Sequence, residues 1–93
     1  MIKSFRDKRT AAIFAGLKIK RIHPALQERV REKLKFLDKA RTLMDLQAAR
    51  GNRLEALSGN RKGQFSIRVN DQWRICFLWR ENNVWQVELV DYH

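Results

Sequence analysis

The chain ends in three side chains that could take part in acid–base chemistry: Asp91, Tyr92 and His93. A carboxylate can accept a proton, and an imidazole titrates near neutral pH, so one histidine can both take and give a proton. A tyrosine can stack on a base or donate its hydroxyl to a phosphate oxygen. Placed where a β-strand ends, this tripeptide predicts one edge of a catalytic or binding cleft.

The residues that precede this terminus predict two β-hairpins. Apolar and polar side chains alternate over residues 64–69 and 73–80, which is typical of half-buried strands. Three-residue turns at 70–72 and 81–83 would keep the apolar side chains of neighbouring strands on one face. The predicted cross-strand pairs are Val69 with Trp73, Ile67 with Ile75, Phe65 with Phe77, Trp79 with Trp85, Phe77 with Val87 and Ile75 with Leu89.

The same register predicts a charged group on the other face of the sheet. Arg68 falls opposite Arg74, and Tyr92 emerges on their side, whereas Asp91 falls in register with Trp73 on the core side. Like charges directly opposite each other cost stability unless an anion or solvent screens them. Arginine is suited to bidentate phosphate contact, so a phosphate is the expected occupant. The alternative is that both arginines simply extend into water.

Other residues extend the candidate site. Glu55 is the one acid between Gly51 and Gly63, and it is either a general base or a surface charge. The single cysteine, Cys76, has no adjacent histidine, and there is no Cys/His cluster of metal-ligand spacing, so no metal or cofactor is expected. The candidate phosphate or RNA contacts are Arg68, Arg61, Lys62, Arg31, Lys35 and Lys39. The last three recur every four residues and form a basic stripe that could meet phosphates or face water.

The N-terminal half has helical patterns. A short strand is expected at 2–5, followed by a helix that Asp7 caps and that runs to about Gly16, with Leu17 on its apolar face. A second helix is expected to start at Pro24, and a capping box at 42–45 predicts a short third helix. The whole chain, 1–93, is therefore expected to be one α+β domain, with two to three helices packed on a twisted antiparallel sheet.

The charge distribution indicates a polyanionic partner. The formal net charge is +10; residues 1–42 contain 13 Lys/Arg and 4 Asp/Glu (net +9), and residues 43–93 contain 7 and 6 (net +1). A positive field of this kind favours nucleic acid or the ribosome as the leading partner class and an anionic membrane surface as the second. The alternative is a basic face that is simply solvated. One cysteine, no signal peptide and no long apolar run predict a cytoplasmic protein outside the membrane.

Three segments resemble one known family. Residues 51–61, the run from Ser66 to Ile75 and the terminal Asp-Tyr-His closely resemble HigB-type toxins of bacterial toxin–antitoxin systems, in the RelE/ParE superfamily and the plasmid maintenance killer family. The resemblance covers nearly the whole chain and implies a small RelE/ParE-like α+β fold. It further implies a ribosome-dependent endoribonuclease that cuts translated mRNA in the A site of the 70S ribosome, without a metal, and so inhibits translation and growth.

The resemblance also implies partners and residue roles. The implied partner is a HigA-type helix-turn-helix antitoxin. The toxin would contact operator DNA only through this antitoxin. The implied catalytic residues are Asp91, Tyr92, His93 and Arg74, and Glu55 stands where some family members carry a catalytic histidine. Two alternatives remain open at this point: a ParE-like toxin that inhibits DNA gyrase without cleaving RNA, and a non-catalytic nucleic-acid-binding module.

Overall fold

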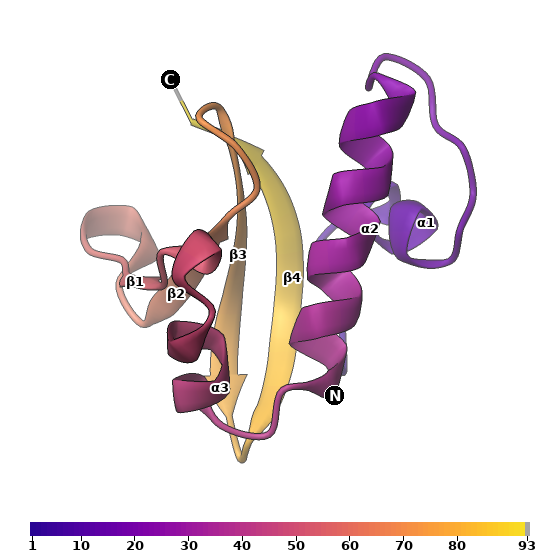
Figure 1. The fold of residues 1–93 in the computed structure, drawn as a ribbon. Coiled ribbons are helices and arrows are strands. Elements are labelled where there is room, and N and C mark those ends of the chain that lie inside the picture. Colours follow the sequence, from indigo (N-terminus) through magenta and orange to yellow (C-terminus); the bar gives the residue numbers. More distant parts are fainter. Residues whose placement is uncertain (93) are drawn as a thin grey trace.

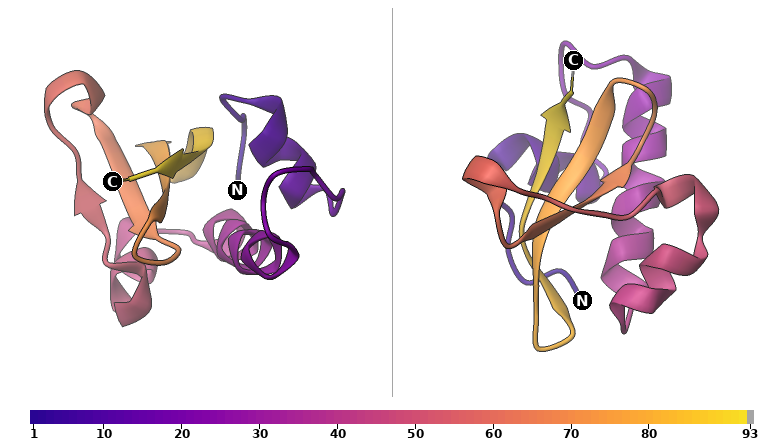
Figure 2. Two further views of the ribbon diagram at one scale, coloured as in Figure 1. Left: turned by 90° about the horizontal axis from the view of Figure 1, so that it is seen from above. Right: turned by 90° about the vertical axis from the view of Figure 1, so that its left-hand side faces the viewer.

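The computed structural model describes residues 1–92 and shows an α+β fold, as predicted. An antiparallel four-stranded sheet has the order β1-β2-β3-β4. Helices α1 and α2 lie on one side of this sheet (Figures 1 and 2), where their apolar side chains meet those of β2, β3 and β4. The elements are α1 (Lys8–Phe14), α2 (Pro24–Lys39), α3 (Leu43–Ala48), β1 (Glu55–Ala56), β2 (Gln64–Arg68), β3 (Trp73–Arg80) and β4 (Asn83–Asp91), with 3₁₀ turns η1 (Arg50–Asn52) and η2 (Gly59–Arg61). In the described part of the chain, no helix is long and apolar enough to cross a membrane.

The helix starts agree with the predictions, and one helix end does not. Asp7 caps α1, Pro24 occupies the first turn of α2, and Thr42 forms the capping box of α3. Helix α1 ends at Phe14, before the predicted end near Gly16, which has a φ of +88°. The prediction that Leu17 packs on the apolar face was therefore wrong, because this side chain lies beyond the helix and is 61% exposed.

The first hairpin has the predicted register. Phe65 pairs with Phe77 and Arg68 with Arg74 across β2 and β3. The turn is held by Asn70, whose Oδ1 accepts from the backbone N–H of Gln72 at 2.9 Å. It also accepts from the N–H of Trp73 at 2.8 Å. This side chain therefore performs the turn-stabilising role that asparagine commonly has.

The second hairpin differs from the prediction near its turn. It has a two-residue turn, Glu81 and Asn82, both with positive φ, and β3 and β4 shift by one residue between Cys76 and Leu78. Trp79 therefore pairs with Val84, and the predicted pairing with Trp85 was wrong. The turn is one residue shorter than predicted, and the irregularity places one extra residue in β4. The two differences cancel, so Ile75 still pairs with Leu89, as predicted.

The same irregularity shapes the contact with the N-terminal segment. Ile2 and Phe5 form isolated parallel bridges with Val84 and Val87 rather than a continuous strand. Gln86, between the two bridges, has a φ of 52°, and its N–H donates to Ser4 Oγ at 2.8 Å. The predicted strand at 2–5 is therefore an extended segment beside β4 that pairs at two points.

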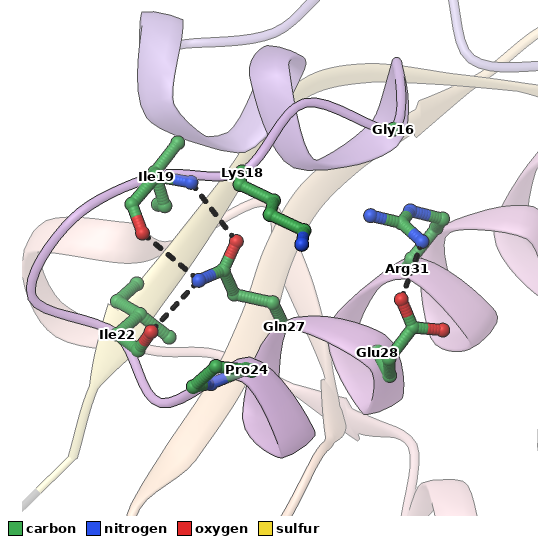
Figure 3. A pocket seen from close by; sticks show the side chains of 8 residues that line it. All are labelled: Gly16, Lys18, Ile19, Ile22, Pro24, Gln27, Glu28 and Arg31. Atoms are coloured by element: carbon green, nitrogen blue, oxygen red, sulfur yellow. Dashed lines mark hydrogen bonds and ion pairs between the residues drawn. The ribbon is translucent and has the colours of Figure 1, made fainter.

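Gln27 anchors the connector between α1 and α2. Its side chain is 5% exposed, and its amide accepts from the N–H of Ile19 at 3.1 Å and donates to the carbonyls of Ile19 and Ile22 at 2.9 and 2.7 Å (Figure 3). A single side chain thus pairs with three backbone groups of the connector. A hollow of about 570 Å³ lies beside it, bordered by Lys18 and Arg31 (Figure 3).

We expect Gln27→Leu to lower the free energy of unfolding by about 2–4 kcal/mol, because it leaves one buried and two partly buried backbone groups without their partner. Gln47→Leu, on the exposed side of α3, is the matched control and should change stability by less than about 0.5 kcal/mol. Urea unfolding of both variants measures the difference. Equal unfolding midpoints for the two variants would show that the connector does not depend on Gln27.

Candidate active site

A cleft of about 370 Å³ opens on the face of the sheet opposite α1 and α2. Its lining comes from the end of η1, from β1, from the β2–β3 turn and from the ends of three strands. The lining residues are Arg53, Glu55, Arg68, Asn70, Asp71, Arg74 and Tyr92. Four residues predicted for the site, Glu55, Arg68, Arg74 and Tyr92, are thus brought together from positions spread over almost 40 residues of sequence.

Arg74 is held in a fixed orientation at the floor of this cleft. Its Nε donates to Ser66 Oγ at 2.8 Å, and its Nη2 donates to the carbonyl of Arg53 at 2.7 Å. Arg53 has a φ of 43°, so its backbone lies in the left-handed region and turns this carbonyl toward the guanidinium. Ser66 is fully buried and the Arg74 side chain is 13% exposed. Most of the freedom of a long side chain has therefore been removed before any ligand binds.

Arg68 and Arg74 are directly opposite each other on β2 and β3, and each has a carboxylate beside it. Arg68 Nη2 forms an ion pair with Asp71 Oδ1, and Arg74 Nη2 lies 3.8 Å from Glu55 Oε2. Both carboxylates are largely exposed, Asp71 at 99% and Glu55 at 62%. Three arginines, Arg53, Arg68 and Arg74, therefore line the cleft, and two carboxylates lie at its surface and partly compensate their charge.

Tyr92 closes one side of the cleft. Its N–H donates to the carbonyl of Gln72 at 2.6 Å, and its hydroxyl lies 3.8 Å from Cys76 Sγ. Burial raises the pKa of the Tyr92 phenol, and the adjacent thiol raises it further. The pKa of Cys76 is also raised, mainly by burial. At neutral pH the phenol is therefore protonated and can donate a hydrogen bond.

The other residues of the terminal tripeptide are placed differently. Asp91 pairs with Trp73, as the register predicted, and its Oδ2 accepts from Gln72 Nε2 at 3.2 Å. It is not among the residues that line the cleft. His93 lies outside the residues that the structure describes, so its catalytic role stays a prediction from sequence.

The remaining candidate phosphate contacts lie outside the cleft. Arg61 Nη1 is 3.1 Å from Glu88 Oε1 and 3.1 Å from Gln64 Oε1, whereas Lys62 is exposed in the adjacent turn. Arg31 donates from Nε to the carbonyl of Ile13 at 3.1 Å and pairs with Glu28 (Figure 3). The stripe that Arg31 shares with Lys35 and Lys39 belongs to the helical layer, and the structure does not bring it to the cleft.

Sequence reasoning missed Arg53, Asp71 and Lys33. Lys33 Nζ lies 2.6 Å from Asn52 Oδ1, and its pKa is lowered by burial first and then by the charges of Arg29 and Arg68. Asp71 was treated only as a turn residue, although its place three residues after Arg68 could have indicated a local ion pair. The left-handed backbone of Arg53 has no signal in the sequence, because such conformations usually favour glycine or asparagine.

The described residues, 1–92, hold no group of three His, Cys, Asp or Glu side chains that could bind a metal ion. The donors that face the cleft are instead guanidinium groups and a phenol. This set matches the oxygens of a phosphate rather than a cation.

Solved structures share the fold. YoeB–YefM toxin–antitoxin complexes from Staphylococcus aureus contain a chain that matches all of this chain and 98% of its own length, with TM-scores of 0.63 and 0.59 and 16% identity in both cases. At that identity the similarity shows the fold alone, and it confirms the predicted RelE-like architecture.

Sequence relatives identify the family. Toxin HigB-1 of Vibrio cholerae is 40% identical over 80 residues, which cover 85% of this chain and 84% of the relative. Endoribonuclease HigB of Proteus vulgaris is 29% identical over the full length of both chains. A family model described as the RelE-like toxin of the type II toxin–antitoxin system HigB matches residues 3–93. The chain therefore belongs to the HigB-like family of RelE-like toxins and is the toxin component of a type II toxin–antitoxin system.

Proposed function

We propose that this toxin is an endoribonuclease that cleaves mRNA in the ribosomal A site during translation and thereby stops growth. The observation that carries the proposal is the convergence of Arg53, Arg68, Arg74 and Tyr92 on one cleft. These groups match the charge and hydrogen-bonding needs of a phosphodiester. The relative from Proteus vulgaris, which is named an endoribonuclease and aligns over the full length of this chain, supports the same activity.

The proposed reaction is an intramolecular transesterification. The ribose 2′-oxygen attacks the adjacent phosphorus, the bond from phosphorus to the 5′-oxygen breaks, and the products carry a 2′,3′-cyclic phosphate and a 5′-hydroxyl. A base takes the proton of the 2′-hydroxyl, and an acid gives a proton to the leaving 5′-oxygen. The guanidinium groups of Arg68 and Arg74 stabilise the negative charge that grows on the phosphate oxygens.

The proton-transfer roles fall to residues at the edge of the cleft. Glu55 is the proposed base, because its carboxylate lies 3.8 Å from Arg74 Nη2 and therefore close to a phosphate bound there. Tyr92, which stays protonated, donates to a phosphate oxygen. His93 is the proposed acid, on sequence grounds. Asp91 positions the terminal segment through Gln72.

The proposed assembly partners follow from charge and family. The excess of +9 in residues 1–42 would dock the toxin on ribosomal RNA. Arg61, Lys62, Lys35 and Lys39 are the proposed peripheral phosphate contacts, and Arg31 is a weaker one because Glu28 neutralises it. The antitoxin would be a HigA-type helix-turn-helix protein that links the toxin to operator DNA, and the toxin would act in the bacterial cytoplasm.

We expect Arg74→Ala to lower single-turnover cleavage of ribosome-bound mRNA by about 100- to 1000-fold, because a donor fixed on the transition-state charge is lost. Arg80→Ala is the matched control: Arg80 lies at the far end of β3, where it stacks on Trp85. The control should retain activity within about twofold, since surface substitutions away from such sites have small effects. If both folded variants cleaved at the same rate, the cleft would not be the active site.

We expect Glu55→Gln to lower the single-turnover rate by at least about 100-fold, the lower end of what a general base typically contributes. Glu81→Gln makes the same charge change in the distant β3–β4 turn and should have little effect. Cleavage by both variants is measured at saturating toxin, so that changes in RNA affinity do not contribute. A rate for Glu55→Gln equal to that of Glu81→Gln would show that Glu55 is only a counter-ion of Arg74.

A further inference from the structure

The Asp71 carboxylate lies beside Arg68, one of the two cations that the proposed function assigns to the substrate phosphate. The Arg68 side chain is 28% exposed and lines the cleft, and its Nη2 pairs with Asp71. The Asp71 side chain itself is 99% exposed. An ion pair with one partner this exposed is held weakly and is easily displaced.

The fold does not need this carboxylate. Asn70 Oδ1 holds the turn by accepting from the N–H groups of Gln72 and Trp73, and the N–H of Val69 donates to the carbonyl of Trp73 at 2.9 Å. Arg68 is the single side-chain partner of the Asp71 carboxylate in the described part of the chain. The Asp71 carboxylate therefore acts on the charge of the cleft and does not stabilise the turn.

The charges around Arg68 explain why a counter-ion belongs there. Arg74 lies directly across the strand pair, and Lys33 on α2 is close enough for its charge to interact with that of Arg68. Without an anion this group of cations repels itself, and Asp71 supplies part of the missing charge. A phosphodiester that contacted both Arg68 and Arg74 would supply it too, and the two anions would then repel each other.

We propose that Asp71 competes with the substrate phosphate for Arg68 and so lowers the affinity of the cleft for RNA. The inference rests on the proposed function, because it assumes that the cleft binds RNA. Weak binding of RNA by the toxin alone would limit cleavage of free RNA. On the ribosome, the mRNA would already be held in position, which would offset the lower affinity of the cleft. Asp71 is then a residue that determines substrate selectivity without touching the reacting atoms.

The test is the affinity for a short RNA whose 2′-hydroxyls are methylated, so that it binds but cannot be cut. We expect Asp71→Asn to bind this RNA about three- to fivefold more tightly than the unmodified toxin in low salt. Asp71→Glu, which keeps the carboxylate, should stay close to the unmodified toxin. Glu81→Gln controls for the change in net charge and should shift affinity less than 1.5-fold. In an Arg68→Ala background, the effect of Asp71→Asn should vanish.

The possible outcomes separate the two proposals. If Arg74→Ala weakens binding but Asp71→Asn behaves like Glu81→Gln, the cleft binds RNA and the inference about Asp71 is wrong. Weaker binding by Asp71→Asn would mean that the carboxylate positions Arg68, which also overturns the inference. If Arg74→Ala and the unmodified toxin bind alike, the cleft is not the RNA site, and the proposed function fails first.

Discussion

The pairing of Arg68 with Arg74 across β2 and β3 is the constraint on which the site depends. Two guanidinium groups directly opposite each other repel and cost stability unless other groups compensate. The structure compensates in three ways: Asp71 pairs with Arg68, Glu55 lies beside Arg74, and the Arg53 carbonyl accepts from Arg74. Under the proposed function, a phosphate bound between Arg68 and Arg74 would satisfy both cations at once, so their mutual repulsion in the free protein would favour phosphate binding.

The fold serves mainly to preserve that pairing and to bring Tyr92 to it. Asn70 fixes the short turn between β2 and β3, so the two arginines cannot slip out of register. In the next hairpin, the two-residue turn and the irregularity near Cys76 offset each other. The end of β4 therefore keeps the alternation that puts Tyr92 on the cleft side and Asp91 in register with Trp73.

Sequence alone was enough for features that depend on alternation, and insufficient for those that depend on local backbone geometry. The opposition of Arg68 and Arg74 follows from period-two patterning and a turn of fixed length. The shift between β3 and β4 does not, because a three-residue turn without a shift and a two-residue turn with a one-residue shift both place Ile75 opposite Leu89. The left-handed Arg53 was equally hidden, although its carbonyl helps to fix the central arginine. The burial of Arg31 against α1 depends on tertiary packing, which a helical repeat cannot reveal.

Mapping new mRNA 5′ ends after brief induction of the toxin is the sharpest test of whether this cleft cuts mRNA on the ribosome. We expect cuts that are confined to translated reading frames, that leave 5′-hydroxyl ends, and that disappear when the start codon of a reporter is removed. Growth arrest without new 5′ ends, or cuts spread equally over untranslated regions, would contradict it.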